Sequence, residues 1–104
     1  MTRISRSDLE AVVRRLNTVT GNSIDPYTKD KDGRFTANIG NYHISGAYGG
    51  VSLHRMATDG GGVSSVFGCG HVTKRDLYDR LHAYLNGIER GVELSAKKRS
   101  EEDA

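Results

Sequence analysis

Two short runs with β-strand character, separated by a pair of glycines, constrain the fold of this 104-residue chain most strongly. In residues 42–47 and 51–56 the side chains divide between two faces, as they do in strands that are buried on one side. Gly49 and Gly50 lie between the runs and can turn the chain back on itself. The sequence therefore predicts an antiparallel hairpin, around which the other elements are arranged.

An amphipathic helix is predicted over residues 7–19, ahead of the hairpin. Ser7 and Glu10 have the spacing of a capping box, in which each side chain binds the backbone of the other residue. Gly21 follows as a natural left-handed terminator. The apolar residues recur at the spacing of one helical face: Leu9, Val12, Val13 and Leu16.

A second helix is predicted from residue 74 to about residue 90. Thr73 and Asp76 form another capping pattern at its start. The inner face of this helix is expected to carry five side chains: Leu77, Leu81, Tyr84, Leu85 and Ile88. Residues 92–104 are rich in charge, and we expect them to form a disordered tail.

The segments between the helices complete an α+β architecture. Residues 22–33 read as a polar loop, residues 34–39 as a first strand and residues 63–67 as a short fourth strand. The order α–β–β–β–(β)–α predicts a single domain over residues 1–91. Its small antiparallel sheet has three to four strands, and the N-terminal and C-terminal helices pack on one face.

The charge and cysteine content narrow the class of protein. The chain carries a net charge of +2, and residues 1–91 alone carry +3, which is compatible with nucleic-acid contact without demanding it. A lone cysteine, Cys69, excludes an intrachain disulfide and fits a reducing compartment. The polar N-terminus has no signal-peptide pattern, and no apolar run reaches the roughly 20 residues of a membrane span. We therefore expect a cytoplasmic protein.

An anion site is one interpretation of the start of the second helix. A helix N-terminus carries about half a positive charge, so Lys74 and Arg75 are unfavourably placed there unless an anion binds. His71 and the glycines around Cys69 would complete such a site. The alternative is that Lys74 and Arg75 face solvent and that Asp76 offsets their charge.

A wider basic surface is a second candidate site. Its phosphate contacts would come from the N-terminal segment, the first helix, the hairpin and the second helix: Arg3, Arg6, Arg14, Arg15, Arg55, Lys74 and Arg75. Tyr48 and His43 would stack on bases or position them. Tyr42 could stack in the same way, but core packing beneath the helices is favoured for it.

Enzymatic and metal-dependent functions are not expected. Cys69 and His71, even with the other histidines, do not form a recognisable zinc pattern. A calcium loop around Gly33 would need carboxylates at Thr28 and Ile39, and Gly60–Gly62 lacks the residues that complete a phosphate loop. No carboxylate pair is placed for acid–base work. We expect no enzyme activity, no cofactor and no metal.

Several short motifs together resemble a family of small uncharacterised proteins of tailed bacteriophages and prophages. The resemblance covers residues 9–90 and implies a phage accessory protein in the bacterial cytoplasm, with no catalytic residues to transfer. The motifs that carry it are Leu16-Asn17 with Gly21, Ile39-Gly-Asn-Tyr-His-Ile44, Ala47-Tyr-Gly-Gly50 with Leu53, Gly60-Gly-Gly-Val63, Thr73-Lys-Arg-Asp-Leu77 and Leu85-Asn-Gly-Ile88.

Two hypotheses of function remain open at this stage. The first is a module that binds nucleic acid or phosphate. The second is an inhibitor or adaptor of a host protein, including a defence factor, that binds through residues 57–70 and an exposed strand edge. An exposed apolar patch at Val63, Val66 and Phe67 would favour the second. A virion component is a third reading, and a homodimer through a sheet edge is compatible with each.

Overall fold

The N-terminal helix is confirmed, but its cap differs from the prediction. The computed structural model describes residues 3–102, with side chains as far as residue 98, and its helix α1 spans Arg6–Thr20. The Asp8 N–H donates to Ser5 Oγ at 3.2 Å, and the Ser5 N–H donates to the Asp8 carboxylate at 2.8 Å. The capping box predicted at Ser7 and Glu10 is therefore wrong. An upstream pair with the same spacing starts the helix earlier, and Gly21 ends it with φ 74° as predicted.

A small hairpin replaces the loop and first strand predicted over residues 22–39. Strands β1, Tyr27–Lys29, and β2, Phe35–Ala37, pair antiparallel as a two-stranded sheet of their own. Asp30 Oδ1 closes the turn by accepting two backbone N–H bonds at 2.9 Å. The strand is shorter than predicted and does not join the main sheet.

The main sheet has three antiparallel strands in the order β3–β4–β5. They span Tyr42–Ala47, Gly50–Met56 and Val63–Ser65. The central hairpin and the fourth strand are thereby confirmed, although β5 ends two residues earlier than predicted. The chain turns at Tyr48 and Gly49, both with positive φ, rather than at the two glycines, and β4 begins at Gly50.

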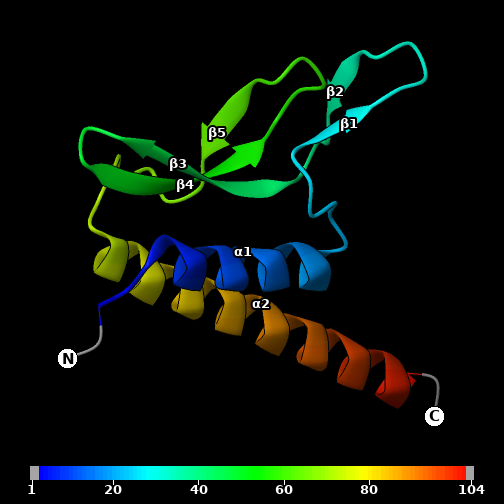
Figure 1. The fold of residues 1–104 in the computed structure, drawn as a ribbon. Helices are drawn as coiled ribbons and strands as arrows, with labels where there is room; N and C mark the ends of the chain where they lie inside the picture. Colours follow the sequence, from blue (N-terminus) through cyan, green and yellow to red (C-terminus); the bar gives the residue numbers. More distant parts are fainter. Residues whose placement is uncertain (1–2, 103–104) are drawn as a thin grey trace.

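Both helices lie on the same face of this sheet (Figure 1). Helix α2 spans Lys74–Glu102 and runs beside α1 in the same direction, so both N-termini lie at the end where β3 turns into β4. The α+β architecture is as predicted. The core between the two layers consists mainly of residues from both helices and the sheet: Leu9, Val12, Val13, Leu16, Tyr42, Val51, Leu53, Leu77, Leu81 and Leu85.

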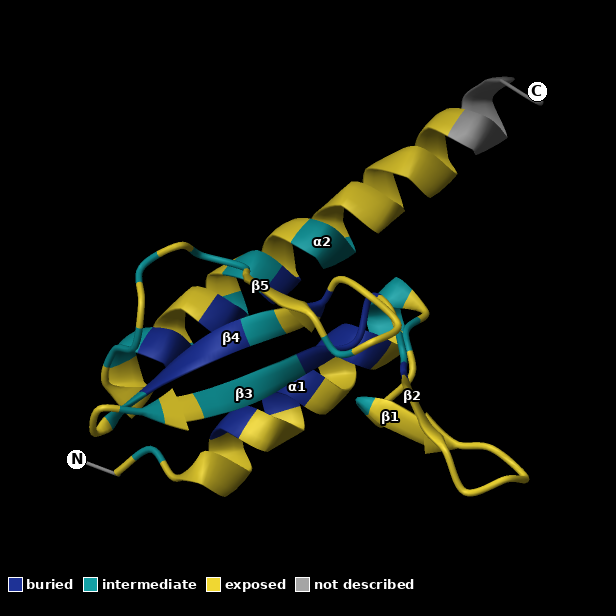
Figure 2. Ribbon diagram, turned by 90° about the horizontal axis from the view of Figure 1, so that it is seen from above, coloured by how far each residue is buried: buried dark blue, intermediate teal, exposed yellow. Residues whose placement is uncertain are grey.

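Helix α2 extends well beyond the second helix predicted from the sequence. The helix expected to end near residue 90 continues to Glu102, and Gly87 and Gly91 do not interrupt it. Residues 91–98, which include most of the described part of the predicted disordered tail, are helical and exposed (Figure 2). Their alanine, leucine, glutamate and lysine side chains favour helix, which explains the continuation. Residues 103 and 104 of that tail lie outside the described part of the chain.

Candidate nucleic-acid interface

Four of the predicted basic residues line one hollow at the end of the molecule where both helices begin. This basic hollow has a volume of about 1030 Å³ and is bordered by Arg3, Arg6, Lys74 and Arg75, together with the β3–β4 turn. None of the described residues that line it is acidic. The N-terminal segment, α1 and α2 therefore bring together cations that are far apart in the sequence.

The two helix N-termini add to the positive potential of the basic hollow. Because α1 and α2 run in the same direction, the positive ends of both helix dipoles lie at this end (Figure 1). Thr73 caps α2, as predicted: its Oγ accepts the Asp76 N–H at 3.1 Å. Lys74 and Arg75 add charge to the end of α2 that is already positive. That arrangement becomes favourable when an anion occupies the hollow.

Arg6 connects the basic hollow to a groove along α1. Its guanidinium is paired with Glu10 at 3.3 Å, and both side chains are exposed. An exposed pair of this kind contributes little stability, so a phosphate can replace Glu10 at small cost. Gly46 on β3 lies beside this arginine, since a Cβ there would be 3.5 Å from Arg6 Nη1.

Tyr48 stands at the tip of the β3–β4 turn, next to the basic hollow. Its side chain is 99% exposed and its φ is 54°, in the left-handed region that bulky residues avoid. The ring has one aromatic neighbour within the described structure, His71, with the ring centroids 5.9 Å apart. A strained aromatic residue that buries almost nothing is a candidate for contact with a ligand.

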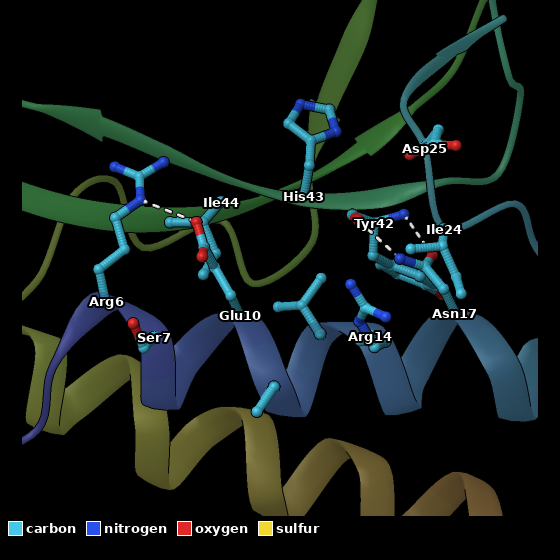
Figure 3. A pocket seen from close by; sticks show the side chains of 12 residues that line it. Arg6, Ser7, Glu10, Arg14, Asn17, Ile24, Asp25, Tyr42, His43 and Ile44 are labelled. Atoms are coloured by element: carbon cyan, nitrogen blue, oxygen red, sulfur yellow. Dashed lines mark hydrogen bonds and ion pairs between the residues drawn. The ribbon is translucent and has the colours of Figure 1, made fainter.

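The groove beside α1 runs along the outer edge of β3 and has a volume of about 540 Å³. Figure 3 shows Arg6, Glu10 and Arg14 of α1 on its helical side and His43 projecting from β3 away from the helix. Asn17 is 1% exposed; it accepts the Tyr42 N–H at 2.8 Å and donates to the Tyr42 carbonyl at 2.9 Å. Arg6, Glu10 and Arg14 give this groove mixed charge, unlike the basic hollow.

Two of the predicted arginines lie away from both surfaces, and His71, which was predicted to complete the anion site, does not line the basic hollow. Arg15 extends toward α2, where it pairs with Glu89 at 2.8 Å. Arg55 lies 5.7 Å from the ring of Tyr42 on the helix-facing side of the sheet. Tyr42 itself is a core residue, as favoured from the sequence: burial and a hydrogen bond with Tyr84 raise its pKa to about 12.

His54 was not predicted as a site residue, but it lies beside two residues that were. It lies opposite His43 in the strand register, and its ring centroid is 5.9 Å from that of His43 and 6.2 Å from that of His71. The strand pattern could have identified His54, because both strand histidines fall on the polar face of the predicted hairpin. Within residues 3–98, no group of three or more histidine, cysteine or acidic side chains is placed to hold a metal ion.

Comparison with known protein families, curated proteins and solved structures gave no match. The resemblance to a phage family therefore stays a prediction. None of the helices in the described residues is long and apolar enough to cross a membrane.

Proposed function

We propose that this protein is a non-enzymatic, phage-encoded accessory module that binds nucleic acid in the bacterial cytoplasm. Its phosphate contacts are made at the basic hollow. The observation that carries the proposal is the convergence of Arg3, Arg6, Lys74 and Arg75 around one hollow whose described lining residues include no acidic side chain. Arg14, about two helical turns beyond Arg6 on the α1 groove, extends the phosphate path past Glu10. Arg15 and Arg55 are left out of it.

Helix geometry and charge support this proposal independently. Lysine and arginine side chains that bind nucleic-acid phosphates displace the counterions condensed on those phosphates. The release of these counterions supplies most of the non-specific affinity. The helix dipoles at the same end reinforce the attraction. Tyr48, strained and exposed beside the basic hollow, offers a ring to the nucleic acid.

The test is a fluorescence-anisotropy titration with labelled single-stranded and duplex DNA and RNA. We expect binding that weakens as salt rises. The Lys74→Ala/Arg75→Ala double variant should bind more weakly, and the slope of log affinity against log salt should fall by about 1.4 to 1.8. Lys97→Ala/Lys98→Ala is the matched control, because it removes two exposed charges from the other end of α2. Absence of binding to all four probes at low salt would refute the proposal.

A second candidate is an inhibitor or adaptor of a host protein, and the outer edge of β3 favours it. Asn17 binds both backbone groups of Tyr42, so those groups face away from β4. By the alternation of an antiparallel pair, the backbone groups of Ile44 and Gly46 also face outward. They could pair with an added strand. The exposed apolar patch at Val63, Val66 and Phe67 that would favour this candidate is not formed, because Val66 and Phe67 pack against the core.

Gly46→Pro tests this second candidate. Proline removes the outward N–H of residue 46 and leaves the bonds to β4 in place, as proline on an edge strand does. If strand addition is the function, host proteins retained by the wild type should be lost with Gly46→Pro and kept with Lys74→Ala/Arg75→Ala. Retention of the same proteins by Gly46→Pro would exclude pairing through this edge.

A further inference from the structure

Four rings form a continuous row on the side of the sheet away from the helices. From the turn inward they are Tyr48, His71, His54 and His43, and we call them the aromatic row. Consecutive ring centroids lie 5.9, 6.2 and 5.9 Å apart, and consecutive ring planes are inclined by 69° to 81°. His43 projects to this side, opposite to α1 (Figure 3).

The main chain holds His71 in the aromatic row. Val72 and Val51 exchange both backbone hydrogen bonds at 2.8 Å, which fixes the end of the loop beside β4. His71 then lies against Gly50, where a Cβ would be only 3.2 Å from the His71 Cβ. Across the sheet, Ser45 Oγ lies 3.5 Å from His71 Nε2. The row therefore depends on the glycine at position 50.

The surroundings of the aromatic row suit uncharged ligand groups. By strand alternation, the side chains between the rings are those of Ser45 and Ser52, and no acidic residue of β3 or β4 shares this face. Burial lowers the pKa of His43 and His54, and the neighbouring histidines lower it further. Both rings are therefore mostly neutral at pH 7. His43 donates its Nδ1–H to Asn41 Oδ1 at 3.2 Å, which leaves its Nε2 as an acceptor, whereas His54 offers one donor and one acceptor.

The aromatic row begins where the basic hollow ends. Tyr48 precedes Gly49, which lines the hollow, and His71 lies two residues before Thr73, which also lines it. A chain whose phosphates occupied the hollow could continue onto the sheet without leaving the protein surface. The bases of that chain would then meet rings rather than charges.

We propose that the aromatic row binds the bases of a single-stranded nucleic acid, which makes single strands the preferred ligand. This inference rests on the proposed binding of phosphates at the basic hollow. A duplex keeps its bases stacked on one another, whereas a single strand can stack them on aromatic side chains. Each base can lie on the face of one ring and bond to the edge of the next.

The experiment compares the affinities of a 12-nucleotide single strand and a 12-base-pair duplex, by fluorescence anisotropy at pH 7.5. We expect the single strand to bind more tightly. His43→Ala/His54→Ala should weaken single-strand binding by about tenfold or more without changing the salt slope, because the neutral rings release no counterions. Phe35→Ala is the matched control: this aromatic residue is 68% exposed on the separate hairpin, outside the aromatic row.

His54→Phe separates base stacking from a general loss of structure. It keeps an aromatic face at the same position, so it should keep most of the single-strand affinity. Equal affinity for both probes, or no effect of His43→Ala/His54→Ala, would overturn the aromatic-row proposal and leave phosphate binding intact. Binding to neither probe at low salt would overturn both proposals.

Discussion

At the scale of single residues, the backbone strain at Tyr48 is not offset by burial of its side chain. A left-handed backbone costs a residue with a bulky side chain about 1–2 kcal/mol, and this ring buries almost nothing in return. Asparagine tolerates the same conformation and is favoured before glycine in a two-residue hairpin turn. The strain therefore has no structural benefit within the described protein, which is consistent with a role in binding.

Tyr48→Asn should raise the free energy of unfolding by about 1 kcal/mol and weaken nucleic-acid binding. The stabilisation follows from relief of backbone strain, and the weaker binding from loss of the ring. Urea denaturation measures the first effect, and anisotropy measures the second. A variant that is more stable and binds as tightly as the wild type would remove Tyr48 from the proposed interface.

At the scale of elements, Gly50 couples the β3–β4 hairpin to the loop before α2. A Cβ at this position would lie 2.9 Å from the Val72 carbonyl oxygen and 3.2 Å from the His71 Cβ. Backbone atoms cannot yield as a flexible side chain does. Gly50→Ala should therefore lower the free energy of unfolding by about 1–3 kcal/mol and displace His71.

Gly46→Ala provides the comparison for Gly50→Ala within the same hairpin. Its added Cβ would meet Arg6 Nη1 at 3.5 Å, which is an ordinary contact with a mobile side chain. Its stability should stay close to that of the wild type. Thermal melting compares the stabilities of the two variants. Equal melting temperatures would mean that the loop before α2 moves easily to accommodate the Cβ that Gly50→Ala adds.

The pair of strand histidines makes stability depend on pH. Burial lowers the pKa of His43 and His54 below the 6.5 of an exposed histidine, so the unfolded chain binds protons more readily than the folded one. Stability is then full above pH 6.5 and decreases as the pH falls below it. The melting temperature should drop between pH 7.5 and 5.5, and His43→Gln/His54→Gln should flatten this drop.

Periodicity in the sequence was enough to predict most of these elements but not their limits. Leu9, Val12, Val13 and Leu16 are buried as the helical pattern required, because amphipathic spacing reports burial directly. The capping box was misplaced because two serine–acid pairs share its spacing. The paired histidines His43 and His54 were visible as a pattern, but their contact with His71 depends on the path of a glycine-rich loop.

At the scale of the whole molecule, the direction of the two helices determines where charge accumulates. A net charge of +2 indicates little by itself, yet parallel helices place Arg6 and Lys74 at the same end. Periodicity cannot predict this convergence, since it depends on how the helices pack and on which way each runs. The same packing separates Arg15 and Arg55 from the basic hollow, and no pattern of residue spacing excludes them in advance.

The C-terminal part of α2 projects beyond the core of the molecule (Figure 2). In the described part of the chain, Ile88 is the last residue that packs against the core, and residues 91–98 are exposed. A chain ending at Gly91 should therefore keep its fold. Its free energy of unfolding should change by less than about 1 kcal/mol, since exposed segments contribute little. Its helical circular dichroism signal should fall with the missing turns.

Nucleic-acid binding by the chain shortened to residues 1–91 tests whether the C-terminal part of α2 belongs to the interface. The basic hollow and the aromatic row both lie within residues 3–75, so affinity and salt slope should match those of the full chain. Lys97 and Lys98 are removed with the segment, so the comparison also detects any contribution of these distant positive charges to affinity. A large loss of affinity in a stably folded 1–91 chain would move the interface to the C-terminal half of α2. Unchanged affinity would confine it to the end where both helices begin.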